Sequence, residues 1–241
     1  MRSVFGIALA AAAWAAAPST ADAHCKDVPA DVVVQKRTVG SFREIAMSAP
    51  ARLVVRQGAR ESLTVKVDRR ALPFVKTPLS GGRLSLELDD PRDQLDCLQE
   101  LTFEVTVVNL SGLDVSGAGT VVLDGLRGKR LSMDLGGAAD VKMDRAALGD
   151  LDLSISGAVK MNASGQATRQ TVRIAGTGKY TADRLTSQTA VVSISGTGHA
   201  RVVAQKDLDA AISGVGSIEY GGNPRLRQRV SGTGSISRMR R

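Results

Sequence analysis

Aromatic residues, cysteine and histidine are scarce in this chain of 241 residues. Aromatics make up 3% of it, and it holds two cysteines, two histidines and one tryptophan. Two cysteines exclude a disulfide-dense scaffold, and so few rings disfavour sugar binding by ring stacking. The hydrophobic content of 43% is too high for a disordered chain. A core must therefore be built from aliphatic residues.

An apolar run near the start of the chain is too short to cross a membrane. It covers 14 residues from Val4 to Ala17, and Ala21-Asp22-Ala23 after it is a small-residue cleavage signal. A membrane-spanning helix needs about 20 apolar residues, so a retained anchor is the weaker alternative, and no later segment is long enough. We predict a signal peptide at residues 1–23 and an exported protein, located in the periplasm, at the cell surface or outside the cell.

Export determines how the two cysteines are interpreted. Cys25 and Cys97 both follow the predicted cleavage site, in an oxidising compartment. The simplest expectation is an intramolecular disulfide between them, and two free thiols are the alternative. His24 and His199 are the only histidines that could join them, so we expect no metal site.

Glycine divides the exported chain, since 20 of the 25 glycines follow Leu110. Residues 24–38 form an N-terminal segment, and residues 39–110 contain short alternating strands such as the one with Leu63, Val65 and Val67. We assign residues 111–237 to a repeat region and residues 238–241 to a basic tail.

A four-residue motif recurs seven times in the repeat region. Its shared glycine is spaced by 20, 20, 19, 20, 18 and 18 residues, which is typical of a solenoid. The copies begin at Ser116, Gly136, Ser156, Ala175, Ser195, Ser213 and Ser231.

Two aliphatic columns flank this motif and alternate with polar positions, as β-strands require. The first column, two residues before the shared glycine, contains Val115, Leu135, Ile155, Ile174, Ile194, Ile212 and Val230. The second, four residues after it, contains Val121, Val141, Met161, Tyr180, Ala200, Ile218 and Ile236. We predict an all-β, single-stranded β-helix or solenoid with parallel coils of about 18–20 residues.

The glycines of the motif have a structural explanation. A sharp corner favours residues that tolerate positive φ, and glycine also allows close approach of two backbone segments. A phosphate-binding loop would need a following helix and a lysine in register, and neither is present. The serines at the corners are expected to form hydroxyl ladders that satisfy backbone groups.

Two outward columns contain the residues that could carry chemistry. Three residues after the shared glycine lie Thr120, Asp140, Lys160, Lys179, His199, Ser217 and Ser235, and Arg201 belongs to the column two residues further on. Lys160, Lys179 and Arg201 form a candidate anion-binding patch, and a solvated mixed face is the alternative. His199 has no serine or cysteine partner by motif. Acidic clusters of the kind that polysaccharide lyases use for calcium are not visible either.

These residues resemble a known family, the exported bacterial proteins described as putative auto-transporter adhesin, head GIN domain. The resemblance extends over about residues 39–237 and rests on the repeated Ser-Gly-x-Gly words, Leu53-Val54-Val55 and the closing phrase from Ile218 to Pro224. It implies a fold similar to right-handed β-helices and adhesion by analogy, with no catalytic residues to carry over. The second glycine is missing at Ala139 and Val159, where wider corners are expected.

We therefore expect an exported, non-enzymatic binding protein of the cell envelope or surface, adhesin-like and without a cofactor. The net charge of +8 favours an anionic envelope glycan or lipid headgroup as partner, and export argues against nucleic acid. An accessory or sensing component of an envelope system and a carbohydrate-active β-helix enzyme are the alternatives.

Overall fold

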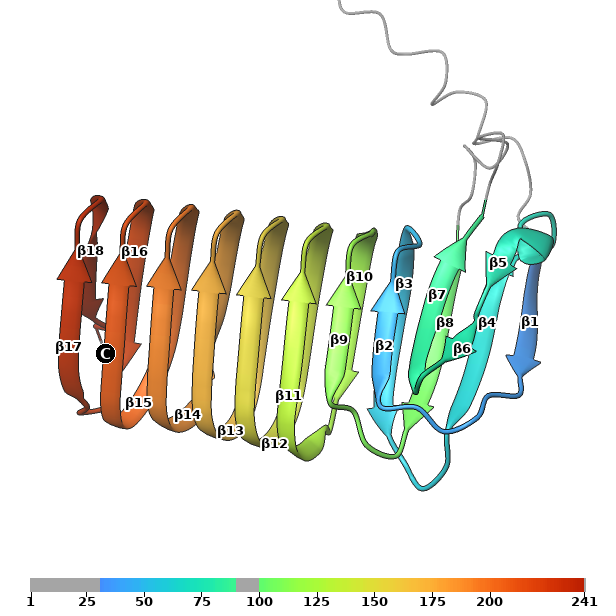
Figure 1. The fold of residues 1–241 in the computed structure, drawn as a ribbon, viewed down its shortest axis with the longest axis horizontal. Coiled ribbons are helices and arrows are strands. Elements are labelled where there is room, and N and C mark those ends of the chain that lie inside the picture. The colour runs from blue at the N-terminus through green and yellow to red at the C-terminus, as the bar shows by residue number, and fades with distance from the viewer. Residues whose placement is uncertain (1–30, 90–99, 241) are drawn as a thin grey trace, which may run out of the picture. The chain divides into compact units, whose positions relative to one another are not determined.

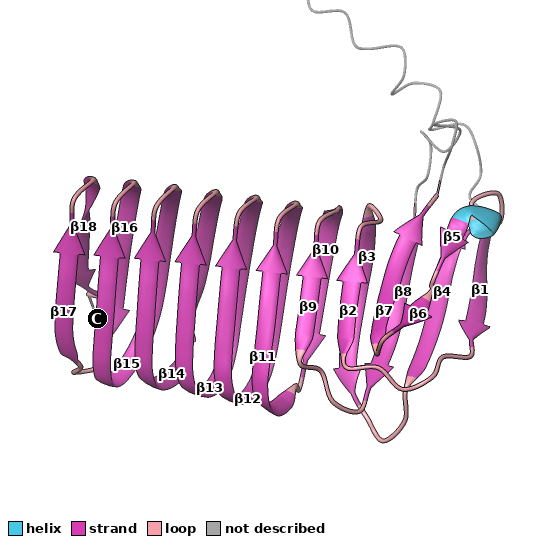
Figure 2. Ribbon diagram, viewed as in Figure 1, coloured by secondary structure: helices cyan, strands magenta, loops and turns pink. Residues whose placement is uncertain are grey.

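The computed structural model describes residues 31–89 and 100–240, and these residues form strands throughout, with one short 3₁₀ helix (Figures 1 and 2). The N-terminal elements are β1 (Val32–Arg37), β2 (Glu44–Met47), β3 (Ala51–Gln57), β4 (Ser62–Asp68), the 3₁₀ helix η1 (Leu72–Phe74), β5 (Val75–Lys76), β6 (Leu79–Ser80), β7 (Arg83–Leu88) and β8 (Leu101–Val107). The repeat region contains β9 (Gly112–Val115), β10 (Ala118–Asp124), β11 (Arg127–Leu135), β12 (Ala138–Ile155), β13 (Ala158–Ile174), β14 (Thr177–Ile194), β15 (Thr197–Ile212), β16 (Val215–Gly221), β17 (Arg225–Val230) and β18 (Thr233–Arg238). The predicted signal peptide and the predicted pairing of Cys25 with Cys97 lie outside the described residues.

Each coil of the repeat region is a long strand bent into two arms. β12, β13 and β14 have 17 or 18 residues each, and each pairs in parallel with the next strand. The pairing of β12 with β13 shifts register between Met143 and Ala146, and that of β13 with β14 shifts between Asn162 and Ser164. The chain bends there, and the Ser-Gly corner closes the coil at the other edge (Figure 2). The structure is therefore the predicted all-β solenoid.

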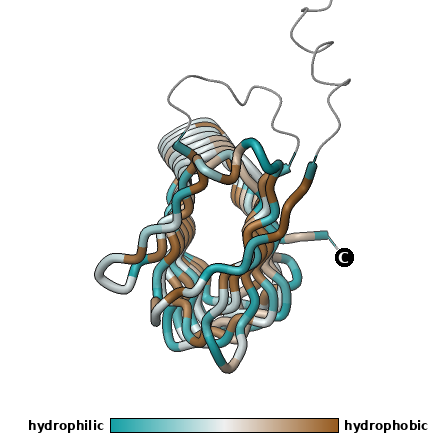
Figure 3. Tube along the Cα trace, turned by 90° about the vertical axis from the view of Figure 1, so that its right-hand side faces the viewer, coloured by the Kyte–Doolittle hydropathy of each residue, from teal (hydrophilic) through white to brown (hydrophobic). Residues whose placement is uncertain are grey.

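The two predicted aliphatic columns form the interior. Along the solenoid, the coils superimpose around a common centre (Figure 3). From Val115 to Ile212 the first column is 0–1% exposed, and the second column from Val121 to Ile218 is 0% exposed. Val230, on the last described coil, is 44% exposed because burial in this fold requires a coil on both sides. The predicted register is thus confirmed.

The shared glycines are required by close stacking of coils, and the expectation of positive φ is wrong for them. None of the seven has φ in the left-handed region. A Cβ on Gly176 would lie 2.2 Å from the carbonyl oxygen of Ser156, and one on Gly196 would lie 2.1 Å from that of Ala175. Each corner therefore rests directly on the backbone of the preceding corner, where no side chain fits.

The corner amides are satisfied by backbone carbonyls, so the expected serine ladder is wrong. The carbonyl of Ile155 accepts hydrogen bonds from the N–H groups of Ala175 and Gly176, at 2.8 and 3.2 Å. The next corner repeats this arrangement on Ile174, and there the Ser195 hydroxyl also approaches the Ile174 carbonyl at 3.5 Å. The corner serines Ser116, Ser156, Ser195, Ser213 and Ser231 are exposed, and Ser195 alone among these five makes such a contact.

The corners without a second glycine are not widened, contrary to expectation. The N–H of Gly157 still donates to the carbonyl of Leu135 at 3.2 Å, as at the other corners. Ala139 and Val159 are only 7% and 4% exposed. Their side chains enter the core instead of the corner, and the coil keeps its shape.

The N-terminal strands continue the same sheet in a different order. The coil made of β2 and β3 lies between the coil of β7 and β8 and the coil of β9 and β10, and all these pairings are parallel. β4 then adds to β8 in antiparallel direction, and β1 adds to β4 in the same way (Figure 1). The described residues, 31–89 and 100–240, thus form one compact unit with a shared core.

Asp68, at the end of β4, fixes the turn that follows this antiparallel cap. Asp68 is 3% exposed, and its carboxylate accepts hydrogen bonds from the backbone N–H and the guanidinium of Arg70, at 2.8–2.9 Å. These bonds lower the pKa of Asp68 from 3.8 to about 2.

Because the pKa of Asp68 is lower in the folded state, ionised Asp68 stabilises the fold above pH 4, and this contribution is lost as the pH falls from about 4 to 2. We expect Asp68→Asn to be less stable than the wild type at pH 7, with the difference narrowing towards pH 2. Urea unfolding of both proteins at pH 7, 4 and 2.5 measures it. Asp134→Asn, a change at an exposed position, is the control. If the two proteins differed by the same free energy of unfolding at all three pH values, ionisation of the Asp68 carboxylate would not be the source of the stability difference.

Candidate functional site

The strand register brings most of the predicted patch together. On β12, β13, β14 and β15 the residues Asp140, Lys160, Lys179 and His199 occupy equivalent positions on consecutive coils. Neighbouring strands lie about 4.8 Å apart, so Lys160 and Lys179 act as one charged pair. Arg201 belongs to the next outward column, paired in register with Thr181 and Glu219.

The three basic residues differ in how far their charges are compensated. Lys160 Nζ lies 3.8 Å from Asp140, and Lys179 forms no ion pair within the described part of the chain. Arg201 lies between two carboxylates, 3.2 Å from Glu219 and 3.8 Å from Asp183. Its charge is therefore neutralised within the protein, and Lys179 is the member best able to attract an anion.

Beside the lysines, the structure places a histidine next to a serine. His199 Nδ1 is 2.6 Å from Ser217 Oγ, and His199 Nε2 is 3.7 Å from Glu219. Sequence motifs missed this pair, although the residues share one column, 18 positions apart. Serine, histidine and glutamate also occur together in hydrolases, but acyl transfer additionally requires free N–H groups that donate hydrogen bonds to an oxyanion. β16 pairs on both sides, with β15 and β18, so its backbone N–H groups are engaged in the sheet and are not free to act as such donors.

An apolar groove runs across the coils along this basic column. It has a volume of about 610 Å³, within the roughly 300–1,000 Å³ range of small-molecule sites. Its floor is formed by Ala139, Val159, Gly178, Gly198 and Gly216. One wall is the row of Ala138, Ala158, Thr177, Thr197 and Val215, and the other is the row of Asp140, Lys160, Lys179 and His199. Side chains of this floor column point into the core, since a Cβ on Gly178 or Gly198 would meet the Ile174 side chain, and the outer face of the floor at these two positions is therefore backbone.

The family model for the putative auto-transporter adhesin, head GIN domain, matches residues 41–224. The chain belongs to this family. The match includes the N-terminal coils from β2 onward and all the coils that form the groove. It confirms the family assignment made from the Ser-Gly-x-Gly words, and it gives this GIN-domain protein an adhesin-like classification.

Solved structures share the fold of this GIN-domain protein. A putative adhesin from Bacteroides fragilis aligns with a TM-score of 0.82 and 21% identity, over 87% of this chain and 97% of its own. A putative adhesin from Parabacteroides merdae aligns with a TM-score of 0.70 and 19% identity, over 87% and 96%. A structure from Parabacteroides distasonis described as a putative lipid binding protein reaches a TM-score of 0.66 and 20% identity, over 87% and 97%. No curated protein matches the chain.

Among the described residues, no helix is long and apolar enough to cross a membrane. Nor do these residues contain a group of three or more histidine, cysteine or acidic side chains that could hold a metal ion.

Proposed function

We propose that this GIN-domain protein is an exported, non-enzymatic binding protein of the bacterial envelope or surface that holds an anionic amphiphile on the groove beside Lys160 and Lys179. The observation that carries the proposal is the coincidence of an apolar groove with adjacent, incompletely compensated ammonium groups. Arg201, paired with Glu219 and Asp183, is not among the residues that line the groove.

The groove and the lysines suit the two parts of such a ligand. An acyl chain on the groove floor would remove apolar surface from water, at about 25 cal/mol per Å². A phosphate or carboxylate at its end would lie next to the Lys160 and Lys179 ammonium groups. His199, held by Ser217 at 2.6 Å, supplies a further polar contact at the same wall. A neighbour in fold is described as a putative lipid binding protein, which is consistent with this ligand class.

Binding to vesicles of phosphatidylglycerol should exceed binding to phosphatidylcholine, and the Lys160→Ala, Lys179→Ala double variant should bind the anionic vesicles about 30-fold more weakly. Each lysine near an anionic membrane surface contributes about 1 kcal/mol, and 1.4 kcal/mol corresponds to a factor of ten. Co-sedimentation at 50 and 300 mM salt measures both effects, and affinity should fall with salt because exposed charges are screened.

The matched control is the Lys129→Ala, Lys206→Ala double variant, which removes two exposed lysines outside the groove. It should bind like the wild type, and Arg201→Ala should reduce binding less than the double variant at positions 160 and 179. Equal weakening by both lysine pairs would mean that only net charge matters. Tight, salt-dependent binding to a lipid-free acidic polysaccharide, with none to vesicles, would replace the amphiphile by a glycan.

A further inference from the structure

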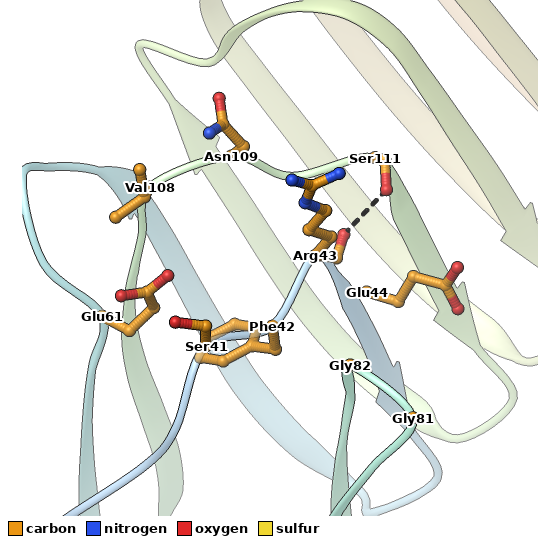
Figure 4. Close-up of a pocket in the computed structure, with 10 residues that line it drawn as sticks. All are labelled: Ser41, Phe42, Arg43, Glu44, Glu61, Gly81, Gly82, Val108, Asn109 and Ser111. Atoms are coloured by element: carbon orange, nitrogen blue, oxygen red, sulfur yellow. Dashed lines mark hydrogen bonds between the residues drawn. The ribbon is translucent and has the colours of Figure 1, made fainter.

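A second cavity lies far from the lysine groove along the chain, among the N-terminal strands (Figure 4). It has a volume of about 440 Å³ and is lined by Ser41, Phe42, Arg43, Glu44, Glu61, Gly81, Gly82, Val108, Asn109 and Ser111. These residues come from four separate segments, which meet because the coil of β2 and β3 is inserted between two later coils.

The backbone of the cavity is held firmly in place. Arg43 N–H donates to the carbonyl of Gly82 at 2.9 Å, and the Arg43 carbonyl accepts from the N–H of Ser111 at 2.8 Å and from its hydroxyl at 3.2 Å. Phe42 is 2% exposed and anchors the segment in the core. On the other side, Gln57 donates to the carbonyl of Val108 at 2.8 Å. The backbone that carries the lining residues is therefore fixed in place by these hydrogen bonds and by Phe42.

The side chains around the opening keep unused hydrogen-bonding capacity. In Figure 4 the Arg43 guanidinium and the Asn109 amide lie on one side of the opening, and the Glu61 carboxylate and the Ser41 hydroxyl on the other. Within the described residues, none of these four side chains makes a hydrogen bond or ion pair to the protein. Glu44 is different, since its carboxylate lies 3.5 Å from Arg83.

We propose that this cavity binds a single neutral sugar residue of a glycan. The Arg43 guanidinium balances the Glu61 carboxylate, and the third charged lining residue, Glu44, lies 3.5 Å from Arg83. The site therefore offers donors and acceptors together without an excess of unpaired charge of one sign. A ring with several hydroxyl groups can donate to Glu61 and accept from Arg43 and Asn109 at once. Recognition here relies on hydrogen bonds and not on ring stacking, because the Phe42 ring is buried. The site is separate from the lysine groove and does not depend on the function proposed for it.

The test uses saturation-transfer NMR on the full chain with glucose, galactose, mannose, rhamnose, N-acetylglucosamine and N-acetylgalactosamine. At least one sugar should give a signal, and Arg43→Ala and Glu61→Gln should each weaken its binding by about 10- to 100-fold, the range for a lost hydrogen bond to a charged group. Both side chains reach the protein surface without partners, so the variants should unfold at the wild-type temperature.

Arg56→Ala, which removes an exposed arginine from β3 outside the cavity, is the matched control and should bind like the wild type. Absence of a signal from all six sugars would overturn the proposal. So would a signal that survives in both cavity variants, or preferential binding of glycine or alanine, whose ammonium and carboxylate would fit Glu61 and Arg43 as an ion pair. The vesicle binding of Arg43→Ala should stay unchanged, which separates this site from the lysine groove.

Discussion

Ile174→Asp should prevent the protein from folding. Ile174 is 0% exposed and lies between Ile155 and Ile194 on the adjacent coils. An aspartate there would bury a carboxyl without a hydrogen-bond partner and would also remove the aliphatic contacts of Ile174. The combined cost is comparable with the stability of a typical domain, about 5–15 kcal/mol. The variant should appear in the insoluble fraction, or lack a cooperative thermal transition by circular dichroism.

Arg173→Asp is the control, because it introduces the same side chain one position earlier on the exposed face of β13. It should fold and melt within a few degrees of the wild type. Ile174→Val, which removes one methylene, should cost about 1 kcal/mol. A soluble Ile174→Asp protein with the wild-type melting temperature would refute the inward register of this column.

Gly176→Ala should destabilise the fold by more than about 3 kcal/mol, at or above the upper end of ordinary overpacking. The new Cβ would lie 2.2 Å from the carbonyl oxygen of Ser156 and 2.4 Å from that of Gly157. Both atoms belong to the backbone, so relief requires the two corners to separate. That movement would stretch the 3.2 Å hydrogen bond from Gly176 to Ile155. Chemical denaturation of the purified variant measures the loss.

Gly128→Ala provides the matched comparison. Its Cβ would meet only the carbonyl oxygen of Leu110, at 4.0 Å, and its φ is not in the left-handed region. The variant should be as stable as the wild type, because alanine also lowers the entropy of the unfolded chain. Similar losses at Gly176 and Gly128 would mean that close stacking of the corners does not explain the repeated glycine.

The solenoid could be predicted from the sequence because one period governs both the motif and its flanks. A residue at a fixed offset from the shared glycine faces the same direction in every coil, so the buried columns follow directly. The reason for the glycine did not follow, since positive φ and close approach produce the same sequence pattern. Only the positions of the carbonyls of the preceding coil distinguish the two.

A buried set of hydrogen-bonded side chains around Gln170 was not predicted from the sequence either. Gln170 is 0% exposed and occupies the position of Leu151 in the preceding coil. Its amide donates to Ser187 at 2.8 Å and its carbonyl accepts from the Tyr180 hydroxyl at 3.2 Å. Gln170, Tyr180 and Ser187 stand at different offsets from the shared glycine, so the repeat pattern does not reveal that they meet. Burial raises the pKa of Tyr180 and keeps its hydroxyl protonated as a donor.

The candidate sites were predictable to different degrees. Lys160 and Lys179 follow from the repeat, because they share one offset from the glycine. The contact of Arg201 with Glu219 follows in the same way, because both lie five residues after the shared glycine. Its contact with Asp183 does not, since Asp183 lies near the bend, where the register between β14 and β15 shifts. The cavity around Arg43 depends on the order of the N-terminal coils, which differs from the order of the chain. No local sequence pattern encodes that order.

Lysine footprinting tests the central claim most directly. The protein is labelled with an amine-reactive acetylating reagent in the presence and absence of phosphatidylglycerol vesicles, and the modification of each lysine is measured by mass spectrometry. Lys160 and Lys179 should be protected by the vesicles, while Lys129 and Lys206 react equally in both samples. Equal labelling of all four lysines under conditions where the protein is bound, or protection confined to Lys129 and Lys206, would contradict binding through the groove.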